Sequence, residues 1–438
     1  MNWRSASSAV RYLLNFPGCI LVFLGCANAT IGLLYIQKPI DLGAQYLPAV
    51  AAVAYFLSRM LFAFEKGLKI SGNELLGYAF AISTAVSVAI QISLGLDATD
   101  SGGLSSLDYT VAMWSFNMLY FFAGAACIRT RYRKSNIVAL ILLSLVLVPF
   151  LAAPKELIFV QFYELTQILG DDRLTHLGIS EWCVFLLIGA FAFSTDRVRP
   201  LVIIVTVVCL FGLQGRSSTL FTPFTMLLFW MLTGGKKAIL LFAGLAIMVF
   251  VALTFFPVFD SLLDADERAL ERMLLDADDG SLQGRRAILE NSLQHLPASI
   301  PYGDPTYIAI EAGTMGSFIH NLLSMWQFFG LLPFLLIVII LIRSVLVMKT
   351  RLRRGSLSVM EEIGCMLLIY SSVSVVFSKS IVFYWLWFAA GYWSLQYSGS
   401  KRKISSRNDK PRFSRKRRSK RRSKSKRSQA LPTGNVHF

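Results

Sequence analysis

The sequence has little charge and lacks the short motifs on which many soluble enzymes depend. Charged residues make up 16% of its 438 residues, whereas a soluble domain typically has about 25%. It contains no GxxxxGK[ST] phosphate-binding loop, no GxSxG and no HExxH. The sequence therefore has no motif that would support ATP-driven chemistry, a serine hydrolase of the GxSxG type or a zinc protease of the HExxH type.

Cysteine pairs are also lacking. The six cysteines lie in apolar segments and form no CxxC pair, so they predict small core residues rather than a disulfide framework. They are Cys19, Cys26, Cys127, Cys183, Cys209 and Cys365. The first apolar run follows basic residues and has no small-residue cleavage pattern, so we expect a retained first helix rather than a cleaved signal.

Apolar residues are abundant, at 55% of the chain with a mean hydropathy of +0.57. They recur in long runs, and about 20 apolar residues suffice for a helix to cross a bilayer. The pattern predicts an all-α, polytopic membrane protein with about 12 transmembrane helices. The expected spans are residues 17–36, 42–64, 74–96, 107–128, 136–153, 179–195, 200–213, 219–233, 237–256, 316–342, 360–377 and 381–397.

Lysine and arginine gather in every second connector, and such connectors face the cytoplasm in membrane proteins. They are residues 65–69, 129–134, 195–199, 234–237 and 343–354. The alternation predicts that both termini are cytoplasmic and that the acidic segment 257–315 is outside. Another outside connector, 154–176, is expected to be either an interfacial helix or an ordinary lid loop.

The chain divides into four parts by composition. Residues 1–256 are expected to form helices 1–9, 257–315 a large outside loop, 316–400 helices 10–12, and 401–438 a cytoplasmic tail. The tail has 16 basic residues and one acidic residue, against 27 and 25 in the rest of the chain. We expect it to be disordered, acting as a topology anchor or binding anionic lipid headgroups; nucleic acid is not an expected partner.

Arg216 lies in LFGLQGRSSTLF, between two short expected spans, the second of which contains Pro223. Arginine at membrane depth costs about 2.5–3.5 kcal/mol on insertion scales and is often functional. Its guanidinium matches a phosphate group, and the hydroxyls of Ser217 and Ser218 would add donors. The alternative is an arginine that extends to the outer headgroups.

Arg285 and Arg286 are adjacent in a loop that has 11 acidic and 4 basic residues. The apolar spacing that follows predicts a short helix beginning at the arginines. They are expected to bind an anion or to pair with the acidic residues 276–279. Those acidic residues lack the spacing of a calcium-binding EF-hand, and neither a metal nor a cofactor is expected.

His320 and Asn321 lie near the outer end of the tenth expected span. A histidine there can act as a base or donate to a phosphate oxygen. The alternative is a hydrogen bond to a neighbouring carbonyl.

Together these patches resemble the O-antigen polymerase and O-antigen ligase superfamily of bacterial envelope glycosyltransferases. The resemblance rests on an arginine between mid-chain spans, GRR in a late outside loop, and HNLLxxxxxxG at the next span. Members with the ligase signature usually have a second glycine soon after the first, whereas here Gly330 is followed by Leu331, Leu332 and Pro333. The subfamily therefore stays open.

The resemblance implies a glycan on undecaprenyl pyrophosphate, presented at the outer face of the bacterial inner membrane, and catalysis without metal or nucleotide sugar. Arg216 and one of Arg285 and Arg286 would hold the pyrophosphate, and His320 would act beside the reacting centre. Other residues expected to contact substrate are Ser217, Asn321 and Tyr302. Further candidate bases are Glu290, Asp304 and Glu311.

Three functions follow in order of expectation. The first is polymerisation of lipid-linked repeat units for O-antigen, capsule or exopolysaccharide, with a chain-length regulator as a partner protein. The second is a ligase that transfers finished polymer to lipid A core or to protein. The third is a transporter or flippase, which predicts internal repeats and charged residues in mid-membrane. The sequence has no clear repeat, and its ionisable residues gather at the outer rim, apart from Arg59 and Glu74 at inner ends, which favours an outward-facing enzyme.

Overall fold

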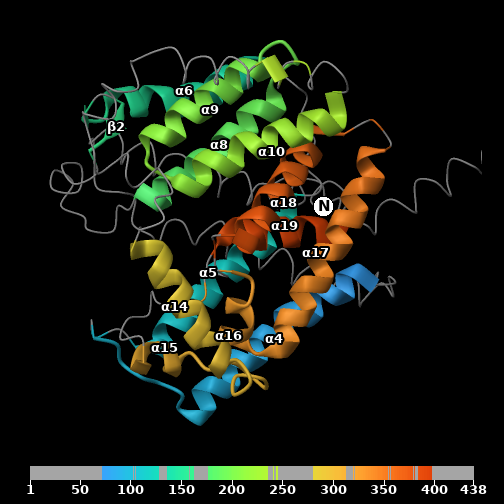
Figure 1. Ribbon diagram of the computed structural model, residues 1–438. Helices are drawn as coiled ribbons and strands as arrows, with labels where there is room; N and C mark the ends of the chain where they lie inside the picture. The colour runs from blue at the N-terminus through green and yellow to red at the C-terminus, as the bar shows by residue number, and fades with distance from the viewer. Residues whose placement is uncertain are drawn as a thin grey trace, which may run out of the picture.

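Figure 1 shows the computed structural model of the chain. It describes residues 72–101, 103, 105–127, 136–156, 158–161, 176–234, 240, 243–244, 280–311, 319, 321–353, 355, 357–377, 379 and 383–396. Two expected spans (17–36 and 42–64), nearly all of a third (237–256), the acidic residues 257–279 and the basic tail lie outside these ranges. About 80% of the described residues are helical, which confirms a predominantly helical protein.

The apolar runs form helices whose bounds match most of the expected spans to within a few residues. These helices are α4 (Gly72–Leu94), α5 (Ser106–Cys127), α6 (Asn136–Ala152), α8 (His176–Phe193), α9 (Arg199–Gly212), α10 (Arg216–Gly234), α17 (Leu331–Leu352), α18 (Val359–Phe377) and α19 (Tyr384–Gln396). A further helix, α14 (Gly280–His295), is polar and lies in the expected loop. Two short helices are α15 (Thr306–Glu311) and α16 (Ser324–Phe329). Proline in the first turn of α9 suits a helix start, where its missing N–H is not needed.

Three of the described helices are long and apolar enough to cross a membrane: α4 over Glu74–Leu94, α17 and α18. Three shorter apolar helices, Asn136–Ala152, Gly178–Phe193 and Arg199–Gly212, accompany them. These helices are compatible with a membrane protein, as predicted.

The expected tenth span, 316–342, is wrong in its extent. Gly330 ends α16 and precedes α17, with a φ of 87° that a side chain would disfavour. A Cβ at this position would also lie 2.8 Å from the backbone nitrogen of Tyr302. The chain therefore breaks at Gly330, and the apolar helix α17 extends to Leu352, so Arg343 lies within a helix rather than in a connector.

Helices α5 and α19 cross in close contact because each has a glycine at the crossing. A Cβ at Gly124 would lie 2.0 Å from the backbone oxygen of Phe388, and one at Gly391 would lie 1.9 Å from that of Phe121. Small residues allow such close approach of helix backbones in membrane proteins. Trp385, Trp387 and Trp393 of α19 are fully buried around this crossing.

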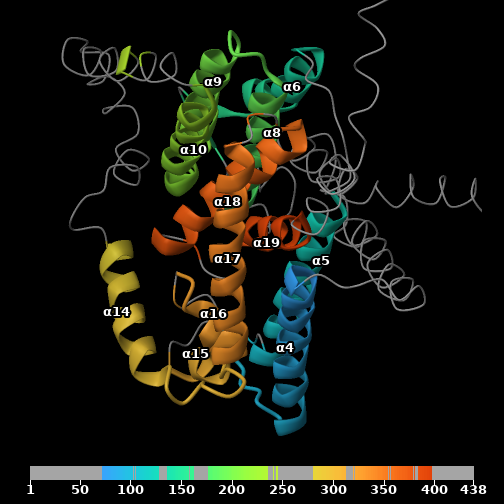
Figure 2. The ribbon, with the colours of Figure 1, turned by 90° about the vertical axis from the view of Figure 1, so that its right-hand side faces the viewer.

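Figures 1 and 2 show the arrangement of the helices around this centre. Helices α6, α8, α9 and α10 lie together on one side, and α4, α5, α14, α15 and α16 on the other, with α18 and α19 between them. Helix α18 packs against both α8 and α10. This places the connection from α18 to α19 beside the beginnings of α8 and α10.

The connector 154–176 begins with a feature that the sequence did not predict. Strands β1 (Lys155–Glu156) and β2 (Phe159–Val160) form an antiparallel hairpin. The Lys155 ammonium donates to the carbonyl oxygens of Phe150, Leu151 and Ala153 at the end of α6, where a cation also complements the helix dipole. This first part is therefore a hairpin rather than an interfacial helix; residues 162–175 are not among those described, so the choice between a helix and a lid loop stays a prediction for them.

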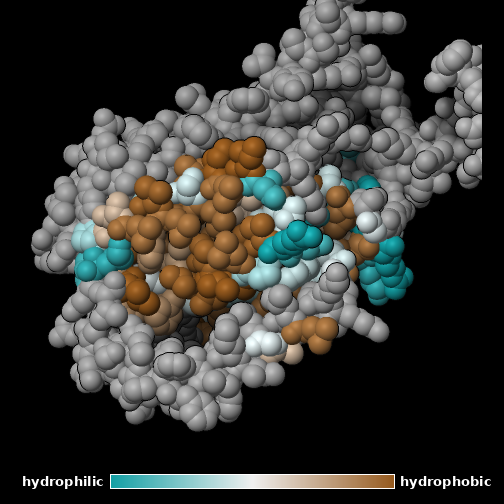
Figure 3. All heavy atoms as spheres, turned by 90° about the horizontal axis from the view of Figure 1, so that it is seen from above, coloured by the Kyte–Doolittle hydropathy of each residue, from teal (hydrophilic) through white to brown (hydrophobic). Residues whose placement is uncertain are grey.

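Apolar side chains cover much of the outer face of α6 and α9. Figure 3, which views the molecule from above, shows a continuous hydrophobic area flanked by small polar patches. Exposed apolar residues of these helices include Ile137, Leu140, Ile141, Leu151, Leu201, Ile204 and Val208. A face of this kind is typical of helices that contact lipid or further apolar helices.

Candidate functional site

The break between α9 and α10 has an unusual backbone. Gln214 has a φ of 54°, the only positive value at a non-glycine position among the described residues, and such strained positions gather at functional sites. A Cβ at Gly215 would lie 2.8 Å from the Ser180 hydroxyl oxygen, so only glycine allows α8 this close. The break predicted at residues 214–216 is confirmed, and Arg216 is the first residue of α10.

A buried acid–base cluster lies directly beside this break. The Lys379 ammonium contacts Glu181 Oε1 at 2.9 Å, and these side chains are only 17% and 5% exposed. The Ser218 hydroxyl donates to the same oxygen at 3.1 Å, and the Tyr370 hydroxyl donates to Oε2 at 3.0 Å. The cluster therefore joins α8, α10, α18 and the connection from α18 to α19.

Further polar contacts fix the position of Glu181. The Trp385 indole N–H donates to its backbone oxygen at 3.0 Å, and the hydroxyl oxygens of Tyr370 and Ser218 are 3.3 Å apart. Removing one member of a buried ion pair typically costs about 3–5 kcal/mol because the other charge is left without a partner. The carboxylate is thus held by hydroxyls from two helices and by the Lys379 charge, and the Glu181 backbone is held by a third helix.

Aromatic rings surround the cluster. Trp182 and Tyr384 stack with ring centroids 5.7 Å apart, and Phe185 stacks on Trp385 at 4.5 Å. The Lys379 ammonium lies 6.0 Å from the Phe383 ring centroid. Rings of this kind lower the local dielectric and so strengthen the electrostatic interactions of the cluster.

A second buried ion pair lies at the other end of α18. Arg199 of α9 contacts Glu362 at 2.7 Å and Asp196 at 3.1 Å, and its guanidinium lies 4.8 Å from the Phe191 ring centroid. Arg351 of α17 contacts Glu361 at 3.4 Å nearby. The Arg199 and Glu362 side chains are nearly fully buried, so this pair connects the beginnings of α9 and α18.

The predicted site residues fall into two groups. Arg216 and the half-buried Ser217 open α10, one turn or less from the cluster residue Ser218. Arg285 and Arg286 lie in α14, which begins at Gly280 and so extends further back than the helix predicted to begin at the arginines. In both views the end of α14 away from α15 lies towards α10.

Tyr302 and Asn321 have local structural contacts. The Gln91 side-chain amide of α4 donates to the carbonyl oxygens of Tyr302 at 2.6 Å and Phe328 at 2.7 Å. The Asn321 side-chain oxygen accepts from the Leu323 N–H at 2.8 Å. The Gln91 bonds join the segment after α14, and α16, to α4. The Asn321 bond lies in the turn that precedes α16. His320 lies outside the described ranges.

The alternative bases differ in their surroundings. Glu290 is exposed on α14, and Glu311 is the last residue of α15. Asp304 accepts hydrogen bonds from the Thr306 backbone and hydroxyl at the beginning of α15. The contacts of Asp304 are those of a helix-capping residue.

Sequence reasoning overlooked Glu181, Lys379 and Tyr370. The available signal was the acidic residue in the apolar run ISEWCVFLLIGAF, because an ionisable residue within an expected span is usually paired or functional. Lys379 lies in a connector of only three residues, which gave no pattern. Within the described ranges no three His, Cys, Asp or Glu residues form a group that could hold a metal ion.

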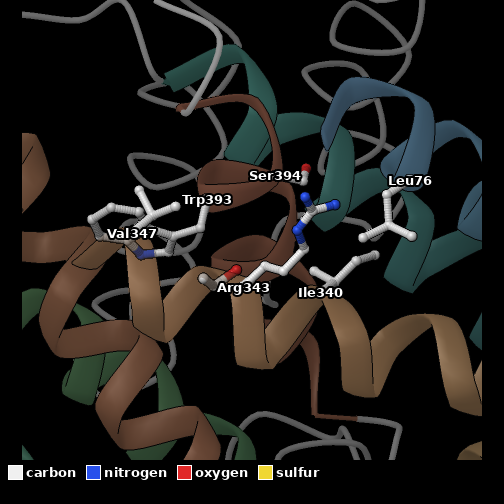
Figure 4. Close-up of a pocket in the computed structure, with 7 residues that line it drawn as sticks. Leu76, Ile340, Arg343, Val347, Trp393 and Ser394 are labelled. Carbon is white, nitrogen blue, oxygen red and sulfur yellow. The ribbon is translucent and has the colours of Figure 1, made fainter. Parts of the chain in front are cut away.

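A small pocket lies elsewhere, between α4, α17 and α19. Figure 4 shows the Arg343 guanidinium directed between Leu76 and Ser394. Ile340, Ser344, Val347 and Trp393 complete its lining. None of the cluster residues lines this pocket.

No protein-family model matches the chain. A comparison with curated proteins also found no match.

Proposed function

We propose that this protein is a glycosyltransferase of the bacterial inner membrane that polymerises undecaprenyl-pyrophosphate-linked oligosaccharide repeat units. In this proposal the chain has about 12 transmembrane helices, a large periplasmic loop between helices 9 and 10, cytoplasmic termini and a disordered basic tail near anionic lipid. A chain-length regulator protein is a further proposed partner. The product is O-antigen, capsule or exopolysaccharide.

The observation that carries the proposal is the beginning of α10 beside the buried cluster. Arg216, Ser217 and Ser218 occupy the first turn of a 19-residue helix, where the helix dipole and backbone N–H groups favour an anion. Lys379 adds a second cation close to Ser218, because both side chains contact the same carboxylate oxygen, Glu181 Oε1. Cations, hydroxyls and a helix N-terminus form the chemistry that binds a pyrophosphate.

The proposed reaction needs positioning and charge stabilisation rather than a redox or metal centre. Pyrophosphate is already a good leaving group, so arginines in a low-dielectric site supply most of what is required. The bond between the anomeric carbon and the pyrophosphate oxygen breaks, and the acceptor hydroxyl forms the new glycosidic bond. Its proton passes to His320, and the negative charge leaves on undecaprenyl pyrophosphate held by Arg216 and by Arg285 or Arg286.

A gel of surface and lipid-linked glycans from a strain lacking the protein tests this function. Single repeat units on the acceptor, with the long ladder absent, would support a polymerase. Long polymer left on undecaprenyl pyrophosphate would instead support the ligase. An unchanged glycan profile would overturn the glycan function.

A transporter or flippase, the third function expected from the sequence, is supported by one observation. Glu181 and Lys379 form a buried ion pair within the helix assembly, and such pairs occur in ion-coupled transport. The same gel separates the two classes, because loss of a flippase would leave the glycans on the cytoplasmic side. Glycans that reach the outer face without the protein would exclude it.

A further inference from the structure

We infer that Lys379 is a substrate-binding residue for the pyrophosphate group of the lipid-linked donor, and that Glu181 is the counter-ion that holds Lys379 when no anion is bound. The inference rests on the proposed function and adds two residues to its site. It predicts that an incoming anion replaces Glu181 as the partner of Lys379.

Glu181 has enough other hydrogen bonds to keep its position when the Lys379 ammonium moves away from its carboxylate. Its carboxylate also accepts hydrogen bonds from Ser218 within α10 and Tyr370 within α18, and its backbone oxygen accepts one from Trp385. Hydrogen bonds from hydroxyls stabilise a carboxylate that has lost a cationic partner. The acid is therefore fixed by three helices independently of the lysine.

Lys379 is held far less firmly. It lies on the connection between α18 and α19 rather than within a helix, and its backbone N–H donates to Ser374. Its ammonium contacts Glu181 at 2.9 Å and lies near the Phe383 ring. A lysine ammonium is a compact charge on a flexible stem, so it can exchange a carboxylate for a phosphate oxygen without movement of a helix.

Charge at the site favours this exchange. Glu181 and Lys379 neutralise each other, whereas Arg216 at the beginning of α10 adds a formal positive charge two residues from Ser218. Pyrophosphate has more negative charge than a carboxylate and therefore attracts both cations more strongly. Glu181 would then compete with the substrate for Lys379.

Competition gives the two residues opposite effects, which a purely structural ion pair would not. Lys379→Met should weaken binding of inorganic pyrophosphate by about tenfold or more, the effect of losing a hydrogen bond to a charged group. Glu181→Gln should tighten it several-fold, since the competing charge is gone while glutamine still accepts from Tyr370. Lys349→Met, which changes an exposed lysine near the end of α17, should leave it unchanged.

The measurement is calorimetric titration of the full-length protein with inorganic pyrophosphate, in nanodiscs of phosphatidylcholine and again with phosphatidylglycerol. Weaker binding in Lys379→Met and tighter binding in Glu181→Gln support the inference. Equal affinities in all variants overturn it. If pyrophosphate binding is lost only in the nanodiscs that contain phosphatidylglycerol, the site binds lipid headgroups. That result would overturn the assignment of Lys379 to the pyrophosphate of the lipid-linked donor.

Two further outcomes keep the test decisive. If Lys379→Met does not fold, Glu181→Gln carries the test alone, and unchanged or weaker pyrophosphate binding in that variant overturns the inference. The proposed function fails separately, when a strain lacking the protein has an unchanged glycan ladder. A normal ladder in Lys379→Met beside a lost ladder in Arg216→Lys would overturn this inference and leave the function standing.

Discussion

The Tyr370 hydroxyl of α18 donates a hydrogen bond to Glu181 Oε2 of α8 at 3.0 Å, across 189 positions of sequence. Ser218 of α10 binds the other oxygen of the same carboxylate. One acidic side chain thus connects three helices at the point where α10 begins. Arg216 is the first residue of α10 and so begins the helix beside this point.

Tyr370→Phe should destabilise the protein by about 1–3 kcal/mol, because it removes one of the donors to a buried carboxylate. Thermal unfolding in detergent measures the change. Ser93→Ala is the control, since that hydroxyl is exposed and bonds only to its own helix, and it should shift stability by less than about 0.5 kcal/mol. A Tyr370→Phe protein as stable as wild type would show that the bond is not structural.

Gly391→Ala should disrupt the crossing of α5 and α19. The new Cβ would lie 1.9 Å from the Phe121 backbone oxygen, so the helices must separate, at a typical cost of about 1–3 kcal/mol or more. Gly72→Ala, which meets nothing within 4 Å, is the matched control. Comparable unfolding temperatures for the two variants would contradict the close crossing.

Arg199→Met should lower stability by about 3–5 kcal/mol, since it removes the cation that contacts the buried Glu362 carboxylate at 2.7 Å. Asp196→Asn removes the other partner of Arg199, but the Asp196 side chain is 79% exposed. That change should cost about 1 kcal/mol at most. The free energy of unfolding of both variants, measured by chemical denaturation, gives the comparison. A greater loss of stability in Asp196→Asn than in Arg199→Met would contradict the burial of the pair between Arg199 and Glu362.

The contact between Asp97 and the beginning of α5 should depend on pH. The Ser105 hydroxyl and the Leu107 N–H bind Asp97 and hold the pKa of this exposed carboxyl below its ordinary value of 3.8. Because the folded pKa is the lower one, the contribution is present above pH 3.8 and is lost as the pH falls through the folded pKa. The protection of the amides of residues 105–108, taken relative to their intrinsic exchange rates, should therefore decrease as the pH falls through the folded pKa in wild type. Asp97→Asn should abolish this decrease.

The sequence was sufficient for several of the described helices but not for the cluster. Apolar runs located α5, α6, α10 and α18 to within a few residues, because the length and composition of such runs indicate helices. The break at residues 214–216 was also predictable, since a glycine and a charged residue interrupt an apolar run there.

Other features required tertiary structure. The break at Gly330 depends on the approach of Tyr302, and the pairing of Glu181 with Lys379 joins residues far apart in the chain. Neither contact has a periodic pattern in the sequence. The predicted roles of Arg216, Arg285, Arg286 and His320 stay predictions.

The most direct test of the central claim is the surface glycan ladder of a strain that expresses Arg216→Lys. Lysine keeps the charge but loses the paired donors that match a phosphate, so we expect a large loss of long chains at a normal protein level. Arg343→Lys, which changes the pocket arginine of α17, should leave the ladder intact. A wild-type ladder in Arg216→Lys would contradict the account.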